Sequence, residues 1–235
     1  MRYALYFTPP REHPLTVAAA AWLGRDAFSG APVPVADRCG LSPADHERLT
    51  APPRRYGFHA TIVAPFRPVP DVTPDDMAAA ARSFAALCRP FAIRALRVAP
   101  LEGFLALVPA QPEAALDVLA AAAVDHFAAL RAPLTPAEIE RRDPARLSPR
   151  QRAYLERYGY PFVKEEFRFH MTLTDPVAEP DASRLESGLA SLFAPALREP
   201  VQLRAVSLFV EPEPGAPFTV HSTHPFTDAE AADHA

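Results

Sequence analysis

An internal repeat constrains this chain more than any other feature of its sequence. The segment YGFHATIVAP at residues 56–65 resembles FRFHMTLTDP at residues 167–176, so that His59 and His170 lie 111 residues apart. A repeat of this length is the size of a domain and not of a solenoid unit. Each copy opens the same order of elements, strand, helix, strand, strand, which predicts a duplicated fold.

The expected fold class is α+β, with bilobal duplicated strand-helix-strand-strand units and antiparallel sheets around a central cleft. We expect one bilobal domain over residues 1–235. One lobe is predicted at about 56–110 and the other at about 165–225, and each carries one copy of the histidine motif. A helical insertion at about 113–160 is expected between them, packed on the outside.

Periodicity, caps and turn residues predict the individual elements. Residues 29–54 are expected to be a proline-punctuated loop with one helical turn near Ser42. Thr73 is the predicted N-cap of a helix that begins with Pro74 at its first position. The remaining predictions are strands at 2–8, 58–66, 91–98, 103–109, 167–174, 201–210 and 217–223, and helices at 16–24, 73–87, 113–130, 148–158 and 181–193.

The repeated strands both read apolar-His-apolar-Thr-apolar. Because side chains alternate across a strand, His59 and Thr61 share one face, and so do His170 and Thr172. If a pseudo-two-fold axis relates the units, these faces meet across a cleft. We therefore predict that His59, Thr61, His170 and Thr172 are the catalytic residues.

Two opposed histidines suit acid and base catalysis at a phosphodiester. One neutral imidazole takes a proton from the attacking water while the other, as imidazolium, protonates the departing alkoxide. The threonine hydroxyls would donate hydrogen bonds to the phosphate oxygens. This chemistry requires neither a cofactor nor a metal. A metal site is the alternative, with Asp175 as an available carboxylate, but the sequence has no HExxH or HxH spacing.

Two neighbouring residues are predicted to bind the substrate. Arg168 lies two residues before His170 and so shares its face, which suits a guanidinium that holds a phosphate oxygen; the alternative is an ion pair with Glu165 or Glu166. Tyr56 precedes His59 by three residues and is a candidate for the cleft wall. Packing is the alternative for Tyr56, and for Tyr3 and Tyr6 on the first strand.

Composition excludes several classes of partner. The formal net charge of −4 argues against binding to a long nucleic-acid duplex, although short RNA ends remain an option. Cys39 and Cys88 have no metal-ligand spacing and suit a reducing cytoplasm. No apolar run approaches the roughly 20 residues that cross a bilayer, so no membrane partner is expected.

The segments FHATI and FHMTL resemble the HxTx signatures of the two-histidine phosphoesterase superfamily, which includes RNA ligase-like proteins and cyclic nucleotide phosphodiesterases. A resemblance over almost the whole chain, carried by RYALYFTPP, PRRYGFHATIVAPFR, LRAPLTPAEIERR and LSPRQRAYLERYGYP among others, is to an uncharacterised family encoded in phosphonate-utilisation operons. The resemblance implies a bilobal fold with a central cleft, a metal-independent mechanism, and catalytic positions at His59, Thr61, His170 and Thr172.

One position departs from that family, which typically has lysine where this chain has Val63. Strict alternation predicts that position 63 faces the cleft beside His59 and Thr61. A lysine there would bind a substrate phosphate. Arg54, Arg67 and Arg168 are the residues available to compensate for its absence.

The expected function is hydrolysis of a small cyclic phosphodiester, a sugar or nucleotide 1,2- or 2′,3′-cyclic phosphate, by a cyclic phosphodiesterase of phosphonate metabolism. The alternatives are a module that binds a phosphorylated metabolite in the same cleft, or an RNA-end ligase. A pure binding module would more naturally use arginine forks than two histidines. The chain lacks a nucleotide-binding glycine-rich loop, which disfavours the ligase. Sequence does not assign acid and base between the histidines, nor the oligomeric state.

Overall fold

The computed structural model describes residues 1–227 and has an α+β fold, in which most strands join one antiparallel sheet. This sheet has seven strands in the order β4-β5-β6-β2-β1-β8-β9. Its members are β1 (Arg2–Phe7), β2 (Ala60–Phe66), β4 (Leu96–Leu101), β5 (Phe104–Pro109), β6 (Met171–Thr172), β8 (Ala205–Glu211) and β9 (Thr219–Pro225). The short strands β3 (Phe91–Ile93) and β7 (Val201–Leu203) form a second antiparallel pair. The α+β class with antiparallel sheets is confirmed.

The helices are α1 (Pro14–Leu23), α2 (Pro43–Tyr56), α3 (Pro74–Ala86), α4 (Ala114–His126), α5 (Pro136–Glu140), α6 (Pro149–Tyr158) and α7 (Asp181–Phe193). Four short 3₁₀ turns accompany them: η1 (Ala128–Leu130), η2 (Pro144–Arg146), η3 (Lys164–Glu166) and η4 (Ala194–Leu197). Local sequence explains several starts. Thr73 and Asp76 form a capping box around Pro74 in α3, and Ser148 and Gln151 form another in α6.

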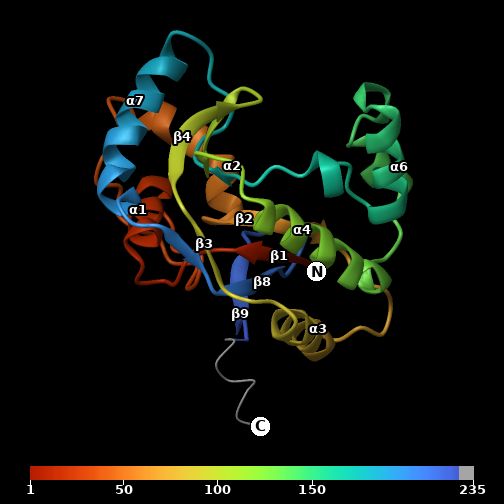
Figure 1. The fold of residues 1–235 in the computed structure, drawn as a ribbon. Helices are drawn as coiled ribbons and strands as arrows, with labels where there is room; N and C mark the ends of the chain where they lie inside the picture. Colours follow the sequence, from red (N-terminus) through yellow and green to blue (C-terminus); the bar gives the residue numbers. More distant parts are fainter. Residues whose placement is uncertain (228–235) are drawn as a thin grey trace.

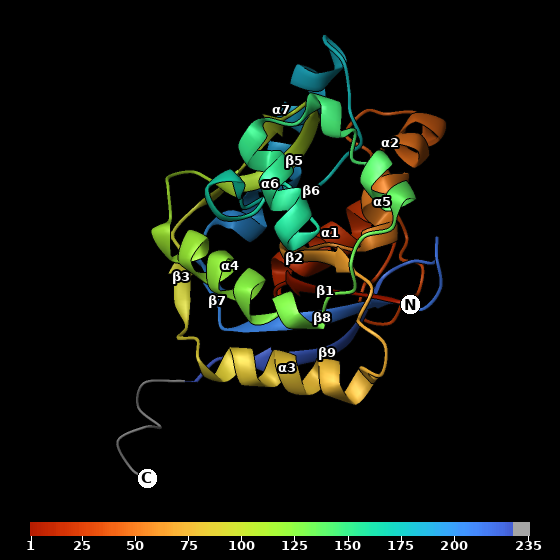
Figure 2. The same ribbon diagram turned by 90° about the vertical axis from the view of Figure 1, so that its right-hand side faces the viewer.

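The element order repeats in the two halves, but the packing crosses between them. Helix α3 follows the first histidine strand and packs against β8 and β9 of the second half. Helix α7 follows the second histidine strand and packs against β4 and β5 of the first half. Figures 1 and 2 show α3 beside β9, and α7 beside β4 on the other side of the molecule. The packed units therefore differ from the two consecutive segments expected from the sequence.

The predicted loop at 29–54 is wrong over its second part, because α2 is a helix of 14 residues that contains Pro52 and Pro53. Proline at position 53 has no N–H to donate to the carbonyl of Leu49, which normally weakens a helix. Here the backbone N–H of Asp175 donates to the Leu49 carbonyl at 2.6 Å. A distant segment thus supplies the hydrogen bond that proline removes.

The strand predicted over 167–174 is shorter in the structure, where β6 contains only Met171 and Thr172. Beyond Thr172 the segment makes hydrogen bonds of other kinds, through backbone and side chain. The Trp22 indole N–H donates to the Leu173 carbonyl at 2.8 Å, and the Leu105 N–H donates to the Thr174 hydroxyl at 3.0 Å. The segment thereby connects α1, α2 and β5.

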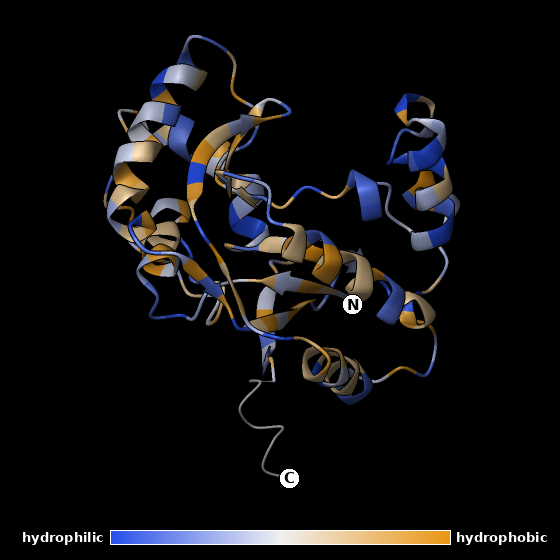
Figure 3. Ribbon diagram, viewed as in Figure 1, coloured by the Kyte–Doolittle hydropathy of each residue, from blue (hydrophilic) through white to orange (hydrophobic). Residues whose placement is uncertain are grey.

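The predicted insertion contains α4, α5 and α6, and it is not confined to the outside. Helix α4 packs against β2, and most of its residues are apolar, whereas α6 is largely hydrophilic (Figure 3). Both helices contribute to the wall of the cleft described below. Among residues 1–227, no helix is long and apolar enough to cross a membrane.

Candidate active site

The two histidine motifs lie side by side in the middle of the large sheet. Strands β2 and β6 are antiparallel, and Ala60 pairs with Met171. This register places Thr61 opposite His170 and His59 opposite Thr172, at the spacing at which cross-strand side chains interact. Ala60 and Met171 are completely buried, and alternation directs the four polar side chains to the other face. The structure therefore brings the four predicted residues together.

The two imidazoles are oriented in the same way by the backbone. In each, Nδ1 lies within hydrogen-bond distance of the carbonyl oxygen two residues earlier, 2.8 Å for His59 with Gly57 and 2.7 Å for His170 with Arg168. A carbonyl only accepts, so Nδ1 carries the proton in both neutral rings. Nε2 is then the nitrogen that exchanges a proton with a substrate, and in His59 it lies 3.3 Å from the Thr61 hydroxyl.

Tyr6 covers His59, a contact that no residue pattern in the sequence predicts. The two rings are stacked with centroids 3.7 Å apart and planes 21° apart. Tyr6 is 1% exposed and comes from β1, where it pairs with Thr61 of β2. Packing was the alternative considered for Tyr6, and Tyr6 does pack. The ring that it packs against is that of His59, a predicted catalytic residue.

The environments of the two histidines differ. Burial lowers the pKa of His59 to about 4; its hydrogen bond to Gly57 opposes this change and the nearby His170 adds to it. Burial also lowers the pKa of His170, and Arg168 adds to that effect. The Arg168 carbonyl and the Glu102 carboxylate act in the opposite direction and favour the protonated ring. Glu102 therefore gives His170 an anionic neighbour that is not among the influences on His59.

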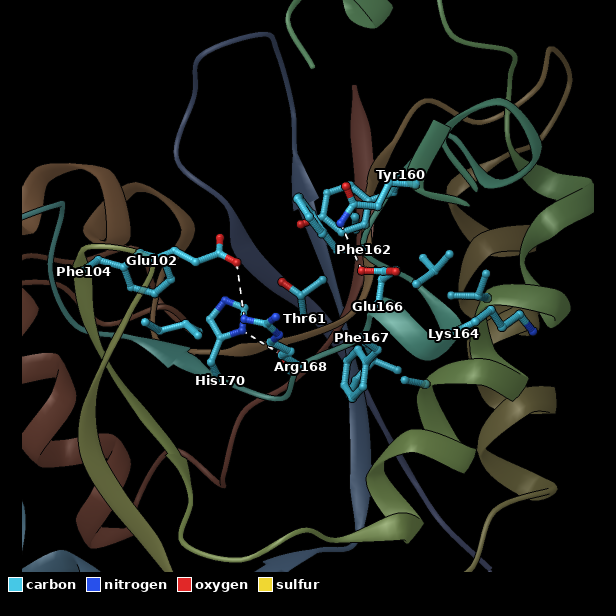
Figure 4. A pocket seen from close by; sticks show the side chains of 17 residues that line it. Thr61, Glu102, Phe104, Tyr160, Phe162, Lys164, Glu166, Phe167, Arg168 and His170 are labelled. Carbon is cyan, nitrogen blue, oxygen red and sulfur yellow. Dashed lines mark hydrogen bonds and ion pairs between the residues drawn. The ribbon is translucent and has the colours of Figure 1, made fainter. Parts of the chain in front are cut away.

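A cleft of about 180 Å³ opens beside these strands. Thr61, His170 and Arg168 line it, whereas His59, Thr172 and Tyr56 are not among its lining residues. Figure 4 shows Glu102, Phe104 and His170 on one side and Tyr160 and Phe162 on the other. The second side belongs to the connection after α6, and Gln151 of α6 and Ala120 of α4 also line the cleft.

Arg168 lies at the cleft, but its acidic partner differs from both that were expected. Its Nη1 is 3.5 Å from Oε1 of Glu102, and both side chains are more than half exposed. Glu165 instead accepts a hydrogen bond from Tyr154, and Glu166 is paired with Arg150. Glu102 occupies the turn between β4 and β5 with φ of 50°, followed by Gly103. No residue pattern near His170 in sequence points to it.

Tyr56 ends α2 and lies near the site without lining the cleft. Its ring stacks on Phe218 with centroids 5.2 Å apart, and its centroid is 6.2 Å from that of His59. The neighbouring Arg55 forms an ion pair with the buried Glu211. Contact with a substrate at Tyr56 stays a prediction, and packing is the contact that the structure displays.

The expected orientation of Val63 is wrong. Val63 is completely buried in the main core, and the cleft is lined by Thr61, Ile62 and Ala64. Two register shifts between β1 and β2 place an extra residue on β2 between the partners of Leu5 and Tyr6, and another between those of Tyr3 and Leu5. Such bulges interrupt strict alternation.

Two of the three arginines that were expected to compensate for the missing lysine lie away from the cleft. Arg54 donates to the Leu23 carbonyl at 2.5 Å, and Arg67 is held by both carboxylate oxygens of Glu138. Neither lines the cleft, so of the three only Arg168 is placed to meet a substrate. Within the described part of the chain, no group of three or more His, Cys, Asp or Glu side chains is arranged to hold a metal ion.

Comparison with known proteins gives relatives of two kinds. The chain is 40% identical over 230 residues to the ribose 1,5-bisphosphate phosphokinase PhnN of Janthinobacterium sp. (strain Marseille), covering 96% of this chain and 51% of that protein. It is 39% identical over 222 residues to the protein of the same name from Laribacter hongkongensis (strain HLHK9), covering 93% of this chain and 50% of that protein. The chain thus spans about half the length of these curated relatives.

A solved structure described as a phosphoesterase aligns with 96% of this chain and 98% of its own, at 14% sequence identity and a TM-score of 0.42. A similarity of this size supports no conclusion about activity. The family described as "Protein of unknown function (DUF1045)" matches residues 61–219, about two thirds of the chain. The expectation of an uncharacterised family is confirmed: the chain belongs to the DUF1045 family.

Proposed function

We propose that this protein is a phosphoesterase that hydrolyses a small cyclic phosphodiester without a metal. The antiparallel register of Ala60 with Met171 carries the proposal, because it sets one His–Thr pair against another on a single face. Two imidazoles with the same Nδ1 anchoring present two Nε2 atoms, one to remove a proton and one to supply it.

Their environments support an assignment of roles. His59, with a pKa of about 4, is neutral near pH 7 and is the base: its Nε2 takes a proton from water as the water oxygen attacks phosphorus. His170 has Glu102 beside it and is the acid: its Nε2–H protonates the ring oxygen as the P–O bond breaks. Water and the cyclic diester thereby become a phosphate monoester and a free hydroxyl.

The other polar groups stabilise charge on the phosphate. The hydroxyls of Thr61 and Thr172 would donate to nonbridging oxygens as negative charge develops there, and the register that sets both on the face of the histidines supports this role. Arg168, at the cleft, supplies a guanidinium whose partner Glu102 is 3.5 Å away and exposed. A phosphate can replace this weak, solvated pair.

The relatives support a sugar phosphate as the substrate. Their name specifies ribose 1,5-bisphosphate as the compound that they phosphorylate. Water attack on a ribosyl 1,2-cyclic phosphate, with rupture of the bond to the 2-oxygen, leaves a 1-phosphate. With a phosphate already at carbon 5, the product is ribose 1,5-bisphosphate. We therefore infer that the substrate is a ribosyl 1,2-cyclic phosphate.

Kinase activity itself is a poorer match to this chain. A phosphate-binding loop of the Walker type needs a Gly-Lys pair, and the single lysine, Lys164, follows Val163. Its Nζ is bonded to Asp125 at 2.5 Å and to the Ala121 carbonyl at 2.9 Å. We infer that the kinase activity named for the relatives resides in the half that this chain does not match.

The test is hydrolysis of ribosyl 1,2-cyclic phosphate, its 5-phosphate and nucleoside 2′,3′-cyclic phosphates, followed by ³¹P NMR. Chelator-treated wild-type protein should open the ribosyl compounds, while His59→Ala and His170→Ala each lower turnover by about 10²–10⁴. His221→Ala, at an exposed site on β9, is the control and should match the wild type.

Other outcomes contradict the proposal in defined ways. Activity that returns only with added metal would replace the metal-free mechanism with a metal site. Preference for nucleoside cyclic phosphates would overturn the substrate inference while keeping the chemistry. Near-wild-type turnover in either histidine variant would overturn the paired mechanism.

A further inference from the structure

Arg131 occupies a junction between the end of β2, the segment after η1 and the end of α6. Its backbone bridges to Pro68, and the next residue donates to the Arg67 carbonyl at 2.8 Å. The guanidinium carbon lies 5.4 Å from the centre of the Phe66 ring. Its Nη1 lies close to Gly159 at the end of α6, 3.9 Å from where a Cβ added to that glycine would be. The side chain is thus held in a defined place, mostly by apolar contact.

The guanidinium of Arg131 has no acceptor. Within residues 1–227, the buried side-chain atoms without a hydrogen-bond partner are its Nε and Nη2 and the hydroxyl of Thr8. These two nitrogens form one edge of the guanidinium fork, which binds carboxylates and phosphates with two parallel hydrogen bonds. Arg67 uses this same edge on Glu138, at 3.1 and 2.9 Å. The equivalent edge of Arg131 has no acceptor from the described part of the chain.

Nearby carboxylates do not fill this role. Glu138 already accepts from Arg67 and from the backbone and hydroxyl of Thr135. Glu156 on α6 is exposed, and no ion pair joins it to Arg131. Burial without a counter-charge accordingly lowers the pKa of Arg131 to about 10. A buried polar group without a partner destabilises the folded state unless something else supplies the hydrogen bonds.

The surroundings favour an anion. Arg131 borders two hollows. Arg67 and Glu138 also line the smaller one. Arg152, Arg157 and Glu156 also line the larger one. Residues 131–168 contain nine Lys or Arg and six Asp or Glu, in a chain whose net charge is −4. This stretch of the chain therefore carries more positive than negative side chains although the whole chain is negative, which favours anionic ligands.

We propose that Arg131 is the anchor of a second anion site, and that this site takes a phosphoryl group. The smaller hollow at Arg131 also contains Ala64 and Tyr160, and both of these residues line the catalytic cleft (Figure 4 labels Tyr160). The site thus adjoins the cleft, with Ala64 and Tyr160 between them. The phosphoryl group comes either from the far end of the substrate, a source that rests on the proposed function, or from free phosphate.

Binding is tested without turnover. The Nε–H signal of Arg131 is identified in ¹⁵N-labelled wild-type protein by its loss in Arg131→Gln, and inorganic phosphate or ribose 5-phosphate is then added. Both probes should shift this signal, while ribose and sodium chloride at matched ionic strength leave it in place. A signal that does not move with either phosphate compound overturns the proposal, whether or not the protein hydrolyses any cyclic phosphodiester.

Kinetics then distinguish the two sources. The substrates are ribosyl 1,2-cyclic phosphate with and without a 5-phosphate. If the substrate supplies the phosphoryl group, Arg131→Gln raises KM about tenfold for the 5-phosphorylated compound alone, the loss expected for a charge-assisted contact. If free phosphate supplies it, the KM values stay near wild type although the NMR shift is present.

Two further variants guard against a purely structural effect. Arg146→Gln removes an arginine whose side chain is 85% exposed and which lies outside both hollows, so it should match the wild type in every measurement. Arg131→Lys keeps the charge without the fork and should bind phosphate more weakly than wild type. If Arg131→Lys and the wild type bind phosphate equally, the fork has no role and the proposal fails.

Discussion

The two predicted catalytic histidines have the same local geometry but different surroundings. His59 and His170 lie in the same Phe-His-apolar-Thr pattern and have the same hydrogen bond from Nδ1 to a carbonyl. Tyr6 stacks on the first ring, while Glu102 and Arg168 are close to the second. Neither Tyr6 nor Glu102 lies near its histidine in sequence, so the division of roles depends on residues that the repeated motif does not contain.

We expect the pH dependence of kcat/KM to reflect these two environments. The base is inactive when protonated, so activity rises as the pH passes the His59 pKa of about 4. The acid is inactive when deprotonated. Because the pKa of His170 is lowered from 6.5, activity should begin to fall at a pH below about 6.5 as the pH is raised. The expected profile is a bell with its maximum on the acidic side of neutrality. In His170→Ala the remaining activity should lack the alkaline limb, and an unchanged alkaline limb would contradict the assignment.

Helices and strands have the bounds that local sequence predicts where capping sets those bounds. They differ from the prediction where a contact with a distant segment sets them. Thr73 caps α3 as expected and Ser148 caps α6, because a capping box needs only residues three apart in sequence. Helix α2 continues through Pro53 because Asp175 supplies a hydrogen bond from far away. The bulges of β2 likewise depend on pairing with β1, and they turn Val63 into the core.

Replacing Val63 with lysine tests this orientation. A lysine in the core leaves an ammonium without a partner, so Val63→Lys should lower the free energy of unfolding by about 3 kcal/mol. Val63→Met, an apolar residue of greater volume, should lower it by less. Urea unfolding provides both values. A stable Val63→Lys protein with a lower KM would show instead that this side chain reaches the cleft.

Over the whole molecule, the two halves form one structure. Helices α3 and α7 each cover strands of the other half, and β2 and β6 join the halves in the middle of a continuous sheet. The cleft lies at this junction, and the helices between the halves supply part of its wall. Neither half contains a complete site or a complete covering for its strands.

Unfolding of the chain should therefore be a single transition. Trp22, the only tryptophan, is buried and donates to the Leu173 carbonyl next to β6, so its fluorescence reports on the contact between the halves. We expect urea curves from tryptophan fluorescence and far-ultraviolet circular dichroism to coincide. A fluorescence transition that precedes the loss of secondary structure would mean that the halves separate before they unfold.

The sequence by itself determined the antiparallel α+β class, most helix starts and the two equivalent His–Thr pairs, His59 with Thr61 and His170 with Thr172, because alternation and capping act over a few residues. The tertiary structure decided what lies against those four residues. It packed α3 and α7 each against strands of the other half. It placed Glu102 and Tyr6 beside the histidines and turned Val63 into the core. It also left one edge of the Arg131 guanidinium without an acceptor. These features depend on strand register and on contacts between distant segments, and neither is encoded in the local pattern of residues.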